Sequence, residues 1–337
     1  MHIIVDGVFN HVGRTFPAFQ DLLKNRENSA YKDWFCNVNF GGNNEYNDGL
    51  SYENWGGYNL LVKLNQRNPE VKSYLFEAIK FWIDEFDIDG IRLDAADVLD
   101  FDFMRELRGF TSGLKEDFWL MGEVIHGDYS RWANGDMLDS VTNYELHKGL
   151  YSGHNDHNYF EIAHSVRRLL GICGDTRLYT FVDNHDVERI YSKVNNKEHL
   201  YNIYILLYTL YGIPSVYYGS EFAIEGKKEN GSDWNLRPCL ELDDFKDAYE
   251  NNEITALCAN RQFAYSRSID KKTVIVALNN DDNEAVITIN PRTECMGAKI
   301  ILDGNNKAKN EEVEAKAENG NIIVKLPANY GTIIELS

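Results

Sequence analysis

Residues 69–94, PEVKSYLFEAIKFWIDEFDIDGIRLD, decide the fold of this chain. The first two thirds of the stretch carry apolar side chains at four-residue spacing, which predicts a helix with one buried face that begins at Pro69. These side chains are Val71, Leu75, Ile79 and Ile83. The stretch closes on residues 86–94, an apolar run that ends in a carboxylate and is typical of a buried strand. A helix followed by such a strand is the repeating unit of a parallel α/β sheet.

The same alternation continues on both sides of this stretch. Further apolar runs that end in a polar residue are residues 3–6, 119–123, 138–142, 179–183 and 215–218. A second long helix is predicted over residues 200–211, which are apolar on nearly every face and suit a helix buried between a sheet and a neighbour. We therefore expect an α/β fold with six parallel strands.

Two segments break this rhythm and suggest the domain organisation. Residues 13–63 are rich in Asn, Gly, Tyr and Trp without a sustained period, and are too long for a simple connection, so we interpret them as an inserted lobe. From residue 253 to residue 337, short alternating segments separated by Asn-Asn, Asp-Gly and Asn-Gly turns predict an antiparallel β-sandwich. Within it, residues 311–318 approach low complexity and receive no strand. The α/β domain then comprises residues 1–12 and 64–252.

Composition limits the partners and the location of the protein. The 34 Lys and Arg against 53 Asp and Glu give a net charge of −19, which argues against nucleic acid and anionic lipid as partners. No stretch approaches 18 consecutive apolar residues, so no membrane span is expected. The five cysteines lack CxxC spacing, which predicts reduced thiols. No secretory signal opens the sequence, which favours the cytoplasm, although residues 1–6 read as the inside of a buried strand and indicate a missing natural start.

Polar groups gather where the predicted strands end. The four richest ends are residues 6–11 (DGVFNH), 90–97 (GIRLDAAD), 122–124 (GEV) and 181–186 (FVDNHD). In a parallel α/β barrel, such ends share the mouth where active sites are assembled. Taken singly, each has a structural explanation, such as a salt-bridged carboxylate or a core histidine. Their combination favours a catalytic site.

Three carboxylates at these ends match the requirements of one reaction. Retaining glycoside cleavage uses a carboxylate nucleophile and a carboxylic acid about 5–5.5 Å apart. A third carboxylate raises the pKa of the neighbouring acid by like-charge repulsion. An arginine two residues before an aspartate lies on the same strand face and keeps that aspartate ionised, and Arg92 and Asp94 have this spacing.

These four segments, in this order, resemble the four signature regions of the α-amylase family of glycoside hydrolases, and the likeness spans about residues 2–337. The resemblance implies that Asp94 is the nucleophile, Glu123 the general acid/base and Asp186 the transition-state stabiliser. It also implies substrate binding by a second set of residues. That set is His11, Arg92 and His185.

Two further segments resemble the same family. Residues 63–65 (KLN) resemble its fifth region in cyclomaltodextrinases and neopullulanases, and residues 233–238 (DWNLRP) resemble the stretch after its eighth strand. The implied activity is retaining hydrolysis of α-1,4 bonds in starch or maltodextrins. Two alternatives stay open, a transglycosylase of the same family and an inactive glucan-binding protein. Aromatic candidates for sugar stacking are Trp55, Tyr58, Trp132 and Trp234.

The sequence departs from the family pattern in two ways. The implied fold is a (β/α) barrel of the TIM type, but the first signature region lies at the end of the family's third strand, so we expect a barrel that is incomplete at its N-terminus. The chain is then either a piece of a longer product or a homo-oligomer that completes the barrel with another copy. Calcium is bound at the position of Asn10 in many members, but Val98 replaces a frequent ligand, so we assign no metal ligand and expect no required cofactor.

Overall fold

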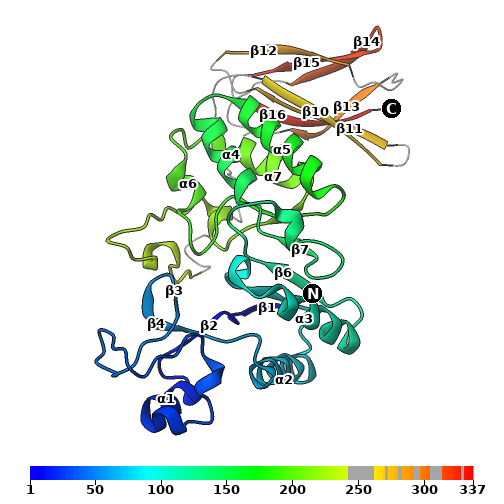
Figure 1. Cartoon of the computed structure of the whole chain (residues 1–337). Helices are drawn as coiled ribbons and strands as arrows, with labels where there is room; N and C mark the ends of the chain where they lie inside the picture. Colours follow the sequence, from blue (N-terminus) through cyan, green and yellow to red (C-terminus); the bar gives the residue numbers. More distant parts are fainter. Residues whose placement is uncertain are drawn as a thin grey trace. The chain divides into compact units, whose positions relative to one another are not determined.

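The computed structural model describes residues 1–241, 262–269, 272–279, 283–290, 297–303, 313–327 and 330–336. The chain divides into two units (Figure 1). The first unit comprises Met1–Thr142 and Ile172–Tyr179, and the second comprises Asn143–Gly171 and Thr180–Ser337. The domain boundary predicted at residue 253 lies outside the described residues. Within the described part of the chain, no helix is both long and apolar enough to cross a membrane.

The first unit is built on a parallel sheet in the order β1-β5-β6-β7. The strands are β1 (Ile4–Gly7), β5 (Gly90–Leu93), β6 (Trp119–Gly122) and β7 (Ser140–Val141). A parallel bridge from Thr142 to Tyr179 extends the pairing by one further segment. The four strands overlap the predicted apolar runs, and the first residue after β5, β6 and β7 is polar: Asp94, Glu123 and Thr142.

The helix predicted over the deciding stretch is α2 (Pro69–Phe86). Its first turn is capped by the Asn68 side chain, which accepts hydrogen bonds from the backbone N–H groups of Glu70 and Val71. The prediction that the following strand starts at residue 86 was wrong, because the helix continues through Phe86 and ends at Asp87 in the left-handed region (φ 48°), so that β5 begins at Gly90. Helix α3 (Phe101–Leu114) is capped in the same way by Asp100.

The segment interpreted as an inserted lobe has secondary structure of its own (blue in Figure 1). It holds helix α1 (Pro17–Asn25) and an antiparallel sheet in the order β2-β4-β3. The strands are β2 (His11–Gly13), β4 (Tyr58–Lys63) and β3 (Asn54–Trp55). His11 pairs with Lys63 at the base of the lobe. His11 is half-buried there and interacts electrostatically with Asp94, the residue that follows β5, so it is not a core histidine.

The described part of the second unit opens with a group of helices. They are α4 (Tyr144–Asn155), α5 (Tyr159–Cys173), α6 (Ile190–Lys193) and α7 (His199–Thr209). Helix α7 confirms the helix predicted over residues 200–211, and seven of its residues are buried. It packs on strand β16 so closely that a Cβ on Gly331 would lie 2.5 Å from the side chain of Ile205.

Strands β8 (Tyr179–Phe181) and β9 (Ile213–Ser215) form a separate two-stranded sheet. The strand predicted over residues 215–218 therefore lies earlier in the chain. The reason is a turn in which the Ser220 N–H donates to Tyr217 O at 3.0 Å, so that the apolar residues after Ser215 leave the sheet. The remaining short helices are 3₁₀ segments: η1 (Arg26–Asn28), η2 (Lys32–Trp34), η3 (Ala96–Val98), η4 (Tyr129–Arg131), η5 (Ser220–Phe222) and η6 (Trp234–Leu236).

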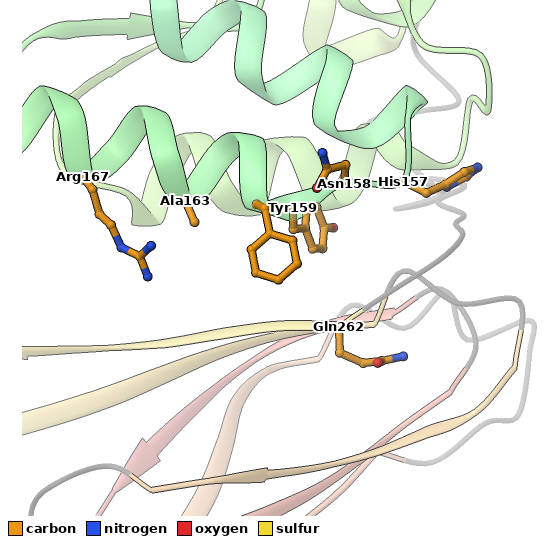
Figure 2. A pocket seen from close by; sticks show the side chains of 7 residues that line it. His157, Asn158, Tyr159, Ala163, Arg167 and Gln262 are labelled. Atoms are coloured by element: carbon orange, nitrogen blue, oxygen red, sulfur yellow. The ribbon is translucent and has the colours of Figure 1, made fainter.

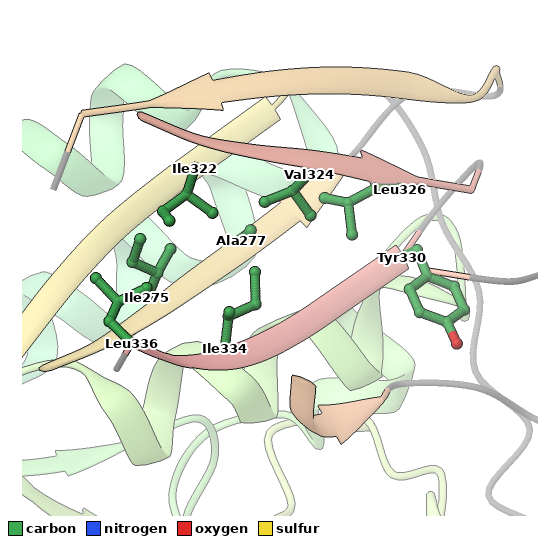
Figure 3. Packing of buried hydrophobic residues seen from close by; sticks show 8 residues of the cluster. All are labelled: Ile275, Ala277, Ile322, Val324, Leu326, Tyr330, Ile334 and Leu336. Atoms are coloured by element: carbon green, nitrogen blue, oxygen red, sulfur yellow. The ribbon is translucent and has the colours of Figure 1, made fainter. Parts of the chain in front are cut away.

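Two antiparallel sheets form the C-terminal part, as the alternating segments predicted. One has the order β10-β11-β16-β13, with β10 (Gln262–Ile269), β11 (Lys272–Asn279), β16 (Tyr330–Leu336) and β13 (Ala298–Asp303). The other has the order β12-β15-β14, with β12 (Ala285–Ile289), β15 (Asn321–Leu326) and β14 (Glu314–Glu318). Their facing side chains, including Ile275, Val324 and Ile334, make one apolar core (Figure 3).

Strand β14 corrects the interpretation of residues 311–318 as near low complexity. Its sequence EAKAE alternates between exposed charged residues and half-buried alanines, and Ala315 and Ala317 pack against the core of the sandwich. Alanine has a low strand propensity, so the period of two was hidden behind an unusual composition.

A buried histidine contacts residues of two further helices in the second unit, and its burial makes the stability of the fold depend on pH. His154 of α4 donates from Nδ1 to Leu150 O at 2.6 Å, while its Nε2 accepts from the Tyr159 hydroxyl at 3.2 Å. Its ring also lies 5.2 Å from that of His199 on α7. Burial lowers the pKa of His154 to about 3, so the folded state favours the neutral ring.

We expect stability to be full above pH 6.5 and to fall as the pH drops from 6.5 toward 3, because the unfolded chain takes up a proton that the folded chain excludes. The contribution of this group is roughly 1.4 kcal/mol per pH unit. Urea unfolding at pH 7, 6 and 5 checks this, with His154→Asn expected to remove about half of the slope, because burial also lowers the pKa of His147 in the same helix to about 3. His164→Gln, at an exposed position of α5, should leave the slope unchanged.

Candidate active site

Three strand ends bring the predicted residues of the first unit together. Asp94 directly follows β5, and its N–H donates to Gly7 O of β1 at 3.1 Å. Glu123 directly follows β6, and its N–H donates to Leu93 O of β5 at 2.8 Å. The parallel ladder therefore continues one residue beyond each strand, which fixes Asp94 and Glu123 on neighbouring strand ends.

The Arg92 guanidinium joins the carboxylates of this unit. Its Nη1 lies 2.9 Å from Asp94 Oδ1 and 2.8 Å from Asp6 Oδ1, and its Nη2 lies 3.0 Å from Glu123 Oε2. Asp6 is the register partner of Arg92 across the β1-β5 pair, which explains that contact. Asp94 and Glu123 thus bind the same guanidinium from neighbouring strand ends.

The Arg92 guanidinium stays charged although it is mostly buried. The Arg92 side chain is only 13% exposed, and burial alone would lower its pKa. The charges of Glu123, Asp6 and Asp94 outweigh burial and raise the pKa of Arg92 instead. The arginine is therefore a permanent cation beside Asp94, as the two-residue spacing predicted.

Glu123 is the more enclosed of the two carboxylates. Its side chain is 12% exposed, against 24% for that of Asp94. Its Oε2 accepts a hydrogen bond from the Ala95 N–H at 3.2 Å. The preceding Gly122 allows this close approach, because a Cβ there would lie 2.7 Å from that of Ala96. Glu123 is consequently fixed in direction by its neighbours rather than free to rotate.

His11 stands at the edge of the same cluster. Its Nδ1 lies 3.3 Å from Asn10 Nδ2, and its ring centroid lies 5.7 Å from that of Trp55. Burial lowers the pKa of His11, and the charge of Asp94 opposes that shift, so the ring is largely neutral near pH 7. A neutral imidazole can accept or donate a hydrogen bond to a hydroxyl group, which suits the predicted role in substrate binding.

The residues present fit a calcium ion poorly. Asn10 Oδ1 is buried and has no hydrogen-bond partner, as a metal-ligating oxygen could be. Val98, at the position where a second ligand would be expected, is exposed and offers no side-chain oxygen. In the described ranges no group of three or more His, Cys, Asp or Glu side chains is placed to hold a metal ion.

The second unit holds His185 and Asp186 with a partner that sequence reasoning missed. His185 Nε2 lies 3.1 Å from Asp186 Oδ2, and Arg237 Nη2 lies 2.7 Å from Asp186 Oδ1. Arg237 Nε also donates to His185 O at 2.9 Å, so one guanidinium holds both residues. Asp233 lies 3.3 Å from the same Nη2. The turn itself is set by Asn184 Oδ1, which accepts from the Asp186 N–H at 2.8 Å.

The four aromatic residues predicted to stack on sugars differ in their exposure to solvent. Trp132 is buried, with its ring centroid 6.1 Å from that of Phe101, so its assignment as a sugar-stacking residue was wrong. Trp55, Tyr58 and Trp234 are exposed and stay candidates. Trp132 follows a 3₁₀ turn that folds back on α3's first residue, a contact that periodicity alone does not reveal.

Comparisons with known proteins agree with this geometry. Residues 1–284 match the family described as "Alpha amylase, catalytic domain". A cyclomaltodextrinase of Bacillus sp is 33% identical over 314 residues, covering 83% of this chain and 54% of the relative. A maltogenic α-amylase of Bacillus acidopullulyticus is 31% identical over 307 residues, covering 83% of this chain and 52% of the relative.

Among solved structures, a cyclomaltodextrinase superposes with a TM-score of 0.81 at 28% identity, covering 100% of this chain and 60% of that chain. The chain belongs to the α-amylase family of glycoside hydrolases, and its α/β domain is of the TIM-barrel type with C-terminal antiparallel sheets. It spans about half the length of the curated relatives that it matches.

Proposed function

We propose that this chain is a retaining α-glucan hydrolase that acts on α-1,4-glucosidic bonds of starch or maltodextrins. The observation that carries the proposal is the Arg92 guanidinium, which holds Asp94 and Glu123 within one hydrogen-bonded group at adjacent strand ends. The family membership supports glycoside chemistry, and the names of the relatives, cyclomaltodextrinase and maltogenic α-amylase, favour maltodextrins as the substrate class.

The proposed first step divides the work between the two carboxylates. Asp94, paired with Arg92, attacks the anomeric carbon of the sugar. Glu123 in its acid form gives a proton to the departing glycosidic oxygen, so that the C–O bond breaks as the bond from carbon to Asp94 forms. Glu123 then takes a proton from water, which attacks the same carbon and releases Asp94.

Asp186 has a different proposed role. It would bind sugar hydroxyl groups as positive charge develops on the ring, with His185 and His11 as further hydrogen-bonding partners of the sugar. The contact between Arg237 and Asp186 supports this role, because it fixes the direction of a carboxylate that must act as an acceptor.

The experiment that tests the proposal measures reducing-sugar release from maltoheptaose and soluble starch by the purified chain. We expect turnover with retention of the anomeric configuration. NMR of the freshly formed product measures that configuration. Product analysis at high maltotriose concentration separates hydrolysis from transglycosylation, since longer products appear only if a sugar hydroxyl captures the intermediate. Binding without turnover would instead support the inactive glucan-binding alternative.

Glu123→Gln tests the acid/base assignment. We expect a loss of about 10²–10⁴ in kcat on maltoheptaose, because the departing oxygen then leaves without a proton. For aryl maltosides with good leaving groups, the rate of the first step should fall much less. The bell-shaped pH–rate profile should lose its fall at high pH, which reports deprotonation of the general acid. An equal loss on both substrates would remove Glu123 from this role.

Arg237→Ala tests whether Arg237 positions Asp186. We expect kcat/KM to fall by roughly 10–100-fold with little change in Tm, because the pair lies in a partly exposed position and contributes little to stability. Arg237→Lys should recover part of the activity, since it keeps the charge but loses the second hydrogen bond. Lys228→Ala, which removes a contact to Asp233 alone, is the matched control, and an equal effect of both alanine variants would contradict the assignment.

A further inference from the structure

A pocket lies in the second unit, between helix α5 and the start of strand β10 (Figure 2). It encloses about 190 Å³ and includes no residue of the candidate active site. Its lining includes Asn158, Tyr159, Phe160, Ala163, Arg167 and Gln262. Neither the proposed reaction nor the family signature regions account for this pocket.

The helix builds one wall by its periodicity. Phe160, Ala163 and Arg167 are spaced at i, i+3 and i+7, so they share a face of α5. Figure 2 shows Ala163 and Arg167 on the side of α5 that is turned toward Gln262 of β10. Because the Ala163 side chain is small, it leaves room for the pocket, and the larger neighbouring side chains border that pocket.

The wall residues are fixed in place by their own hydrogen bonds. Gln262 Nε2 donates to Asn279 Oδ1 at 2.9 Å, which sets the plane of the Gln262 amide. The Tyr159 hydroxyl is bonded to the buried His154. A pocket whose polar groups are held in advance binds a ligand with less loss of side-chain entropy.

The chemistry of the lining suits a sugar. The Phe160 side chain is 82% exposed, so a flat apolar ring faces solvent at the pocket. Asn158 and Gln262 offer amides that both donate and accept, and Arg167 offers a planar set of donors. The C–H face of a glucose ring stacks on such an aromatic surface while its hydroxyl groups bond to planar amides.

Charge also favours a neutral ligand over an anion or a cation. Among the described residues, no Asp or Glu lines the pocket, although the chain as a whole has a net charge of −19. A cation would find no carboxylate there. An anion would meet Arg167, but it would gain nothing from the exposed Phe160 ring.

We propose that this pocket is a second, non-catalytic binding site for one glucose unit of an α-glucan, which holds polymeric substrate on the protein. The choice of glucan as ligand rests on the proposed function. The site differs from the catalytic cluster in its purpose, because it adds affinity for a long or granular substrate without touching the bond that is cleaved.

Adsorption to starch granules tests the proposal on the full chain carrying Asp94→Asn, so that the substrate is not consumed. Phe160→Ala in that background should weaken adsorption about tenfold, the loss expected when one stacking contact of about 1.4 kcal/mol is removed. Ala163→Trp should weaken it as much by filling the pocket. In the otherwise unchanged chain, Phe160→Ala should leave kcat/KM on soluble maltotriose within about twofold, with Tm unchanged.

The control and the contrary outcomes are distinct from those of the proposed function. Tyr208→Ala removes an exposed aromatic ring of α7 that does not line the pocket, and it should leave adsorption unchanged. Adsorption that is absent, or that survives both Phe160→Ala and Ala163→Trp, overturns the proposal, as does displacement of bound maltotriose from the pocket by inorganic phosphate. Adsorption that depends on Phe160 in a chain without hydrolytic activity would uphold this site while overturning the proposed function.

Discussion

Replacing Asp94 with Asn is expected to lower kcat on maltoheptaose by at least about ten-thousandfold, the order of loss seen when a hydrolase loses its nucleophile. The amide has nearly the same shape as the carboxylate but cannot form the glycosyl ester. Because Arg92 also contacts Asp6 and Glu123, the cluster keeps two of its three ion pairs, and the fold should survive. Reducing-sugar assays and Tm measured on the same preparation separate the two effects.

Asp102→Asn is the matched control for that loss. Asp102 lies on the exposed surface of α3, where its carboxylate pairs with Arg105 three residues later. It should change neither kcat nor Tm appreciably. If Asp94→Asn retained activity within about tenfold of the parent chain, Asp94 would not be the nucleophile.

Replacing Arg92 with Met is expected to produce the largest loss of stability of any single change in the site. Three carboxylates lose their shared cation, and two of them, Asp94 and Glu123, are mostly enclosed. Removing one partner of a buried ion pair typically costs 3–5 kcal/mol, and because Asp6 is half exposed we expect about 3 kcal/mol here. Urea unfolding at pH 7 measures the change, and activity should be lost as well.

Arg92→Lys separates charge from geometry. A lysine supplies the positive charge but cannot reach three carboxylates with a planar fork, so stability should return in part while activity stays low. Arg105→Met removes an exposed pair and should cost less than about 0.5 kcal/mol. If Arg92→Met were no more destabilising than Arg105→Met, the three contacts of Arg92 would not hold the site together.

The sequence predicted the fold well where one periodicity ran unbroken. Helix α2 begins at the predicted residue because Asn68 and Pro69 are local signals, and its apolar stripe needs no knowledge of distant residues. The start of β5 and the position of β9 were less predictable. There the apolar run continued across a helix end or into a turn, so hydrophobicity alone did not mark the boundary.

The candidate site was predictable in composition but not in connection. Spacing by two placed Arg92 and Asp94 on one face, a local relation. The contact of Arg92 with Glu123 depends on the register of β5 against β6, and that of Arg237 with Asp186 joins residues that are 51 positions apart. The signal that indicates Arg237 is its place four residues after Asp233, in a segment whose sequence resembles the family.

The proposed glycosyl ester on Asp94 can be detected by mass spectrometry. The Glu123→Gln variant is mixed with α-maltosyl fluoride, whose fluoride leaves without a proton donor, so that the glycosyl ester forms but is hydrolysed slowly for lack of a base. After an acid quench and digestion, we expect one maltosyl group on the peptide that contains Asp94. A maltosyl group on a peptide with another carboxylate, or turnover of the fluoride with no labelled peptide and an inverted product, would contradict it.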